Sequence, residues 1–84
     1  MDIGKYRMYL QQYIQEAYDE SDGSKAGISS YLWEKKITGL VVRDKKEKEA
    51  ALQEAKRIFD QNRHWPLEII LSYLGVELSQ RQGT

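Results

Sequence analysis

The densest apolar run of this chain lies close to its end and contains the only proline. Pro66 suits the first turn of a helix, where the N–H that proline lacks is not needed. Gly75 suits the left-handed position just past a helix end. Together the two residues predict a short helix over about 66–74, which the rest of the chain has to accommodate.

This predicted helix is apolar on nearly every side, because Glu68 and Ser72 alone give it a narrow polar side. A helix of that kind is buried, either inside its own domain or against a partner. It is far too short to cross a bilayer, which needs about 20 apolar residues. We therefore expect 66–74 to be the central helix of the fold, covered by the other helices or by a second subunit.

A clear amphipathic pattern predicts another helix over about 3–20. Its apolar residues recur mostly three or four positions apart, which places them on one side of the helix. They are Ile3, Tyr6, Leu10, Tyr13, Ile14 and Ala17. Tyr9 and Tyr18 flank this stripe. Because a tyrosine ring joins a large apolar area to a polar tip, as protein interfaces often require, Tyr9 and Tyr18 are candidates for contact with a partner.

The middle of the chain predicts two more helices. Ser29 or Ser30 can cap a helix over about 30–38. Its apolar residues point to two sides, so this helix is either sandwiched or turns one side to a partner. Trp33 is the most conspicuous of these residues, and we count it among the candidate partner contacts.

The spacing of Asp44 and Glu47 is that of a capping box, which predicts a helix over about 44–62. The stretch 40–42 in front of it is aliphatic and mostly β-branched, which is typical of a short strand. The chain offers no second strand to pair with it, and an isolated strand is not stable. We therefore interpret 40–42 as a buried connector, with a strand as the alternative.

The length of 84 residues suffices for one domain, and we expect an all-α, compact four-helix domain over 1–78 followed by a polar tail over 79–84. Thirteen basic residues balance thirteen acidic ones, so the net charge does not steer the chain towards nucleic acid or a membrane. The chain has no cysteine, and its start lacks the apolar run of a secretory signal. We expect a cytoplasmic protein without a membrane partner.

No catalytic, metal or phosphate motif is found. His64 is the only histidine, and no nucleophile pattern accompanies it. An EF-hand register with Gly23 at the glycine position fails, because Tyr18 and Ser29 would fall at ligand positions. The glycines do not have the spacing of a phosphate-binding loop. We predict a protein that is not an enzyme and that needs no cofactor or metal.

The main functional hypothesis is a small protein–protein interaction module, that is, an adaptor, regulator or inhibitor that covers the surface of a partner. The partner is another protein or a second copy of the chain in a homodimer. The hypothesis rests on more apolar and aromatic surface than one stripe per helix requires. The predicted contact residues are Tyr9, Tyr18, Trp33, Val76 and Leu78.

The alternative is a nucleic-acid-binding transcriptional regulator that uses the basic segment 35–48. This segment holds six bases against two acids, and bases contact phosphates. The predicted contacts are Lys35, Lys36, Arg43, Lys45, Lys46 and Lys48. The stretch 26–36 is similar to the turn and recognition helix of helix-turn-helix repressors. The stretch before it is acidic and contains Gly23, so we assign no family on this likeness.

Overall fold

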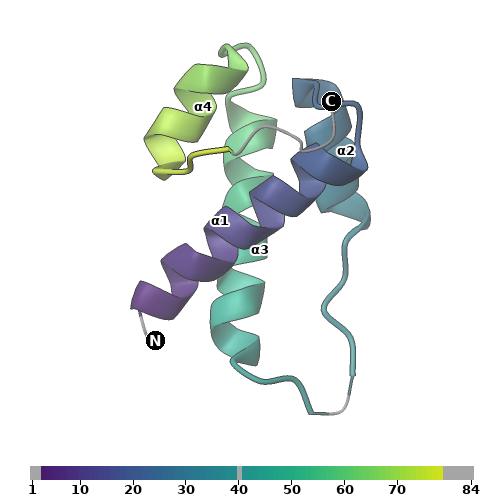
Figure 1. Ribbon diagram of the computed structural model, residues 1–84, viewed down its shortest axis with the longest axis vertical. Helices are drawn as coiled ribbons and strands as arrows, with labels where there is room; N and C mark the ends of the chain where they lie inside the picture. The colour runs from purple at the N-terminus through teal and green to yellow at the C-terminus, as the bar shows by residue number, and fades with distance from the viewer. Residues whose placement is uncertain (1–2, 40, 79–84) are drawn as a thin grey trace.

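The computed structural model describes residues 3–39 and 41–78, which form four helices (Figure 1). These are α1 (Ile3–Glu20), α2 (Lys25–Glu34), α3 (Lys45–Gln61) and α4 (Leu67–Leu74). None of the described residues belongs to a strand. The all-α, four-helix prediction is therefore confirmed. The predicted polar tail 79–84 lies outside the described residues.

The core forms where α1 crosses α3, with α2 packed against both (Figure 1). Ala51 and Ala55 of α3 are fully buried, and their small side chains let the neighbouring helix approach closely. The largest fully buried side chains fill the space around this crossing. They are Phe59, Ile14, Ile28, Leu32, Ile58 and Ile70. The apolar stripes predicted for the first and third helices thus face each other.

The prediction that the last helix is the central one is wrong. Helix α4 packs against the C-terminal end of α3, and Ile70 is its one buried residue. Ile69 is 49% exposed and Tyr73 is 62% exposed. A helix of eight residues at one end of the structure meets too few neighbours to bury every side. The longer stripes of α1 and α3 occupy the centre instead, and the outer apolar side of α4 remains uncovered.

Helix α2 begins at Lys25 and ends at Glu34, and the predicted bounds of 30–38 are wrong. The cap is Ser24, whose Oγ accepts a hydrogen bond from the Gly27 N–H at 3.0 Å. The Asp22 carboxylate accepts the Ser24 N–H at 2.9 Å. A Cβ on Gly27 would lie 2.4 Å from that carboxylate, so glycine lets the cap close. Since Gly27 lies within a helix, the turn of a helix-turn-helix is absent here.

Helix α3 starts close to the predicted position, but the predicted capping box does not form. Asp44 has the left-handed conformation, with φ 56° and ψ 38°, and makes no capping hydrogen bond with its side chain. Its carboxylate instead accepts hydrogen bonds from Tyr9 Oη at 2.7 Å and Lys5 Nζ at 3.0 Å. Aspartate tolerates this conformation better than most residues. Contacts with α1 therefore decide the role of Asp44.

The connector before α3 is not buried as predicted. Val41 is 95% exposed, and neither Val41 nor Val42 belongs to a strand. Leu40 lies outside the described residues. In Figure 1 the connector runs away from the packed helices before it turns back to α3, and Val42 is only partly buried.

Replacement of Phe59 by alanine should lower the free energy of unfolding by about 3–5 kcal/mol, because Phe59 is 1% exposed and its removal leaves a cavity. Urea denaturation of the purified chain measures this change. The matched control is Met8→Ala, which removes a half-exposed side chain and should change the free energy of unfolding by at most about 0.5 kcal/mol. A loss below about 1 kcal/mol for Phe59→Ala would contradict the packing described above.

Candidate docking surface

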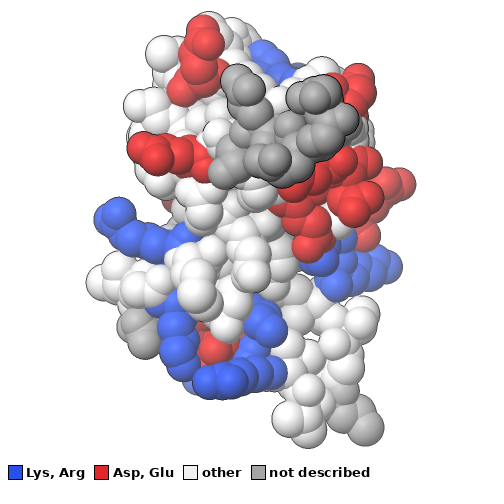
Figure 2. Space-filling model, in the orientation of Figure 1, with Lys and Arg blue, Asp and Glu red and all other residues white. Residues whose placement is uncertain are grey.

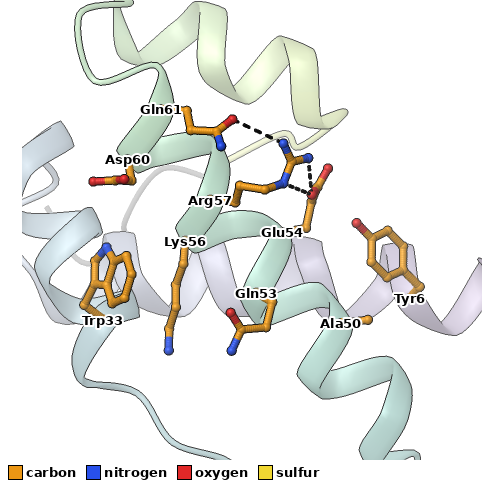
Figure 3. Close-up of a pocket in the computed structure, with 9 residues that line it drawn as sticks. All are labelled: Tyr6, Trp33, Ala50, Gln53, Glu54, Lys56, Arg57, Asp60 and Gln61. Carbon is orange, nitrogen blue, oxygen red and sulfur yellow. Dashed lines mark hydrogen bonds and ion pairs between the residues drawn. The ribbon is translucent and has the colours of Figure 1, made fainter.

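The outer side of α3 carries an open hollow of about 540 Å³ (Figure 3). Figure 3 shows Trp33 of α2 on one side of α3 and Tyr6 of α1 on the other. Residues of α3 form the floor between the two aromatic rings. The complete lining is Tyr6, Trp33, Ala50, Gln53, Glu54, Lys56, Arg57, Asp60 and Gln61. We call this set the α3 face.

The floor of the α3 face follows from the helical repeat. The buried residues of α3 point towards α1 and α2, so the residues between them in sequence point outwards. Arg57 is held in place there, because its Nε donates to Glu54 at 3.0 Å and its Nη1 donates to Gln61 at 3.3 Å. The hydrogen bond to Glu54 is the main reason that the pKa of Arg57 rises above its usual value. The α3 face thus presents an ordered guanidinium.

Trp33 is the one predicted partner residue that lies on the α3 face. It is 54% exposed, which is unusual for a tryptophan in a domain with a well-packed core. The Nζ of Lys56 lies 5.3 Å from the centre of its ring, within the range of a cation–π interaction. This contact orients the indole towards the hollow while leaving half of it accessible.

The aromatic surface continues beyond the α3 face onto α4. A second hollow of about 310 Å³ shares Tyr6 and Glu54 with the first and also includes Tyr73. The ring of Tyr73 meets the ring of Trp65 edge-on at 5.9 Å between centroids. Sequence reasoning did not select Tyr6, Tyr73 or Arg57. Their side chains are partly polar and lie on three different helices, so no local pattern in the sequence indicated that they share one surface.

The other predicted partner residues lie elsewhere. Tyr9 and Val76 are buried in the core of the chain. The residue after Val76 is bonded to α1, because the Glu77 N–H donates to the Gln11 side-chain oxygen at 3.0 Å. Leu78 is partly buried against the same core. The ring of Tyr18 covers Gly23. The structure therefore does not bring these four residues together with Trp33, and their contact with a partner stays a prediction.

The predicted basic segment is divided between internal contacts and one shared hollow. Lys35 pairs with Glu16 at 2.6 Å, and Lys48 lies 5.3 Å above the ring of Tyr9. Arg43 is 3.9 Å from Asp44 and otherwise exposed. A hollow of about 360 Å³ is lined by three members of the segment, which are Lys35, Lys36 and Lys45. Its lining is Lys35, Lys36, Ile37, Thr38, Lys45, Glu49, Leu52, Gln53 and Lys56. We call this set the lysine groove, and Lys46 is not part of it.

The charges of the molecule are separated despite a net charge of zero. Figure 2 shows most acidic side chains on the upper part of one face and most basic side chains on the lower part. The ion pair of Lys5 with Asp44 at 3.0 Å brings α1 beside the start of α3. It thereby adds Lys5 to the basic segment 35–48, and we call the two together the basic end. The basic segment 35–48 already indicated this separation in the sequence.

One polar network fastens the lysine groove to the body of the protein. The carboxylate of Glu16 accepts hydrogen bonds from Tyr31 and from Lys35. Burial alone would raise the pKa of Glu16, but the two hydrogen bonds and the charge of Lys35 together outweigh burial and lower it. The same carboxylate raises the pKa of Tyr31 to about 12, mainly through the hydrogen bond. The network holds the end of α2 against α1.

Neither a metal centre nor a membrane segment is found in the part of the chain that the structure describes. Among the described residues, no three acidic or histidine side chains come together in a way that could hold a metal ion. The described helices include none with the length and apolarity needed to span a membrane.

Comparison of the chain with protein-family models, with curated proteins and with solved structures gives no significant match.

The Glu16 network predicts a pH dependence. The folded state favours the neutral phenol of Tyr31, so this contribution to stability is complete below about pH 10 and is lost as the pH rises from 10 to about 12. The difference in tyrosinate absorbance between the wild type and Tyr31→Phe isolates this titration. Glu16→Gln should move the pKa of Tyr31 down towards 10. Glu20→Gln, a weaker neighbour, should move it much less.

Proposed function

We propose that this chain is a non-enzymatic protein–protein interaction module that docks a partner protein on the α3 face around Trp33. The observation that carries the proposal is the half-exposed indole beside an open hollow, in a domain whose other large side chains mostly pack inwards. Large exposed aromatic groups around a hollow are characteristic of interaction sites.

The composition of the α3 face supports a protein as the ligand. Tryptophan, tyrosine and arginine dominate the binding energy of protein interfaces, and Trp33, Tyr6 and Arg57 supply one of each. Lys56 and Glu54 already hold the indole and the guanidinium in place. Side chains that are ordered before binding lose less entropy on binding. The face therefore offers anchors that need little rearrangement.

The shape of the α3 face supports the same conclusion. Small-molecule sites enclose most of the ligand surface. The floor here is the outer side of one helix, with walls on two sides, as Figure 3 shows. The neighbouring hollow that shares Tyr6 extends the surface towards Tyr73 of α4. A broad, open surface of this kind suits another protein, which contributes about 800 Å² in a typical complex.

The test is affinity capture from the native host with the wild type and with Trp33→Ala, read by quantitative mass spectrometry. A true partner should be enriched by the wild type and reduced about tenfold or more by Trp33→Ala, because loss of a central tryptophan costs an interface about 2 kcal/mol or more. The free energy of unfolding should change by at most about 1 kcal/mol, since Trp33 is half exposed.

Met8→Ala is the matched control. Met8 is 52% exposed and lies outside the α3 face, so its replacement should leave the captured partner unchanged. Equal recovery of every captured protein by the wild type and Trp33→Ala would refute docking at this face. Sedimentation of the purified chain decides whether the partner is a second copy.

A second candidate function is binding of nucleic acid at the basic end. The specific observation is that the fold adds Lys5 to the predicted basic segment through its contact with Asp44. If phosphates are bound, affinity for a DNA or RNA duplex should fall steeply with added salt. Lys46→Glu, at an exposed position, should weaken duplex binding without altering the fold. Binding that is independent of salt would contradict phosphate contact.

A further inference from the structure

The lysine groove has two walls of different kinds. One wall is the stretch from Lys35 to Thr38, which follows α2. The chain becomes extended at Lys35, where φ is −70° and ψ is 134°. The other wall is the side of α3 that carries Lys45, Glu49 and Lys56. A groove between an extended stretch and a helix has the shape in which a partner segment can lie parallel to both.

The extended wall offers backbone groups to a partner. No backbone hydrogen bond joins Lys36, Ile37 or Thr38 to another described residue. Their side chains alternate, with Lys36 and Thr38 exposed and Ile37 packed against the core. This alternation is that of a strand, and the N–H and C=O groups that make no hydrogen bond to the described residues resemble the unpaired groups at the edge of a sheet. An edge strand binds an extended peptide by adding it as a further strand.

The charge of the groove decides the chemistry of that peptide. Four lysines line the groove against a single glutamate. Lys35 is already paired with Glu16, and Lys45 is 3.9 Å from Glu49. Lys36 has no ion pair with a described residue, and Lys56, whose Nζ lies 5.3 Å from the centre of the Trp33 ring, adds a second positive charge. Their positive charge favours acidic side chains on the ligand and disfavours basic ones.

From these observations we infer that the partner docked on the α3 face inserts an extended acidic segment into the lysine groove, alongside 35–38. The inference rests on the proposed function, since the groove shares Gln53 and Lys56 with the α3 face. At about 3.3 Å per residue, the four residues of the extended wall span about 13 Å, enough for about four residues of the partner.

A second copy of this chain does not fit the groove. Pairing of two copies through 35–38 would bring the lysine grooves of both chains together, and like charges across an interface disfavour association. The acidic stretch from Glu16 to Asp22 already makes contacts within its own chain, so it does not supply the acidic segment of a second copy. Glu16 accepts a hydrogen bond from Lys35, and Asp22 accepts one from the Ser24 N–H at the cap of α2. That stretch is folded into α1 and the turn after it, so it is not an extended segment.

The test uses the full chain labelled with ¹⁵N and two capped heptapeptides, one of alternating glutamate and valine and one of alternating lysine and valine. The acidic peptide should shift the amide signals of 36–38, and its affinity should fall as NaCl rises from about 50 to about 300 mM. The lysine peptide should cause no such shifts. Equal binding of both peptides, or shifts confined to other residues, would overturn the inference.

Two adjacent lysines give a matched pair of variants. Lys45 lines the groove and Lys46 does not, although both lie in the first turn of α3. Lys45→Glu should weaken binding of the acidic peptide about fivefold or more, and Lys46→Glu, which changes the net charge equally, should weaken it less than about twofold. Equal effects of the two reversals would mean that overall charge attracts the peptide and would reject the groove.

Two further outcomes separate this inference from its alternatives. Tighter binding of a DNA duplex than of the acidic peptide at 36–38 would overturn it in favour of phosphate recognition. If Trp33→Ala loses a partner while the acidic peptide does not bind, the docking surface stands and the chemistry assigned to the partner is wrong. If Trp33→Ala keeps every partner, the proposed function itself fails.

Discussion

The close packing of α1 against α3 is the contact on which the rest of the structure depends. Ala51 and Ala55 leave room for a neighbouring helix, and Ile14 and Phe59 fill the space around the crossing. Because both helices use their apolar stripes on each other, no element among the described residues covers the opposite side of α3. The α3 face exists for that reason, with Trp33 at its border.

The connector between α2 and α3 is fixed by its two ends. Lys35 binds Glu16 at one end, and Asp44 binds Tyr9 and Lys5 at the other, so both ends are fastened to α1. These contacts set the distance of the extended stretch from α3 and so form the lysine groove. A groove held by ion pairs and hydrogen bonds is formed before a ligand arrives, which reduces the entropy lost on binding.

The helices with long, regular apolar stripes were predictable from the sequence. Over 3–20 and 44–62 the pattern repeats for several turns, so the helix type and the buried side both follow from local spacing. The end of α4 also follows from local chemistry, since Gly75 has φ 72°. The site was less predictable. Trp33 stood out as a large aromatic residue, whereas Tyr6 and Arg57 had no local feature that distinguished them.

Contacts between distant segments decided which residues cap a helix, which pair with another side chain and which are buried. Ser29 and Ser30 were predicted as caps, but both lie within α2, which begins at Lys25 and packs Ile28 and Leu32 into the core. Asp44 was predicted as a cap, but its carboxylate accepts hydrogen bonds from Lys5 and Tyr9 of α1 instead. The burial of a short helix such as α4 depends on how many neighbours it meets. The physical reason is that propensity and periodicity act within a few residues, whereas burial and charge pairing depend on segments far apart in the chain.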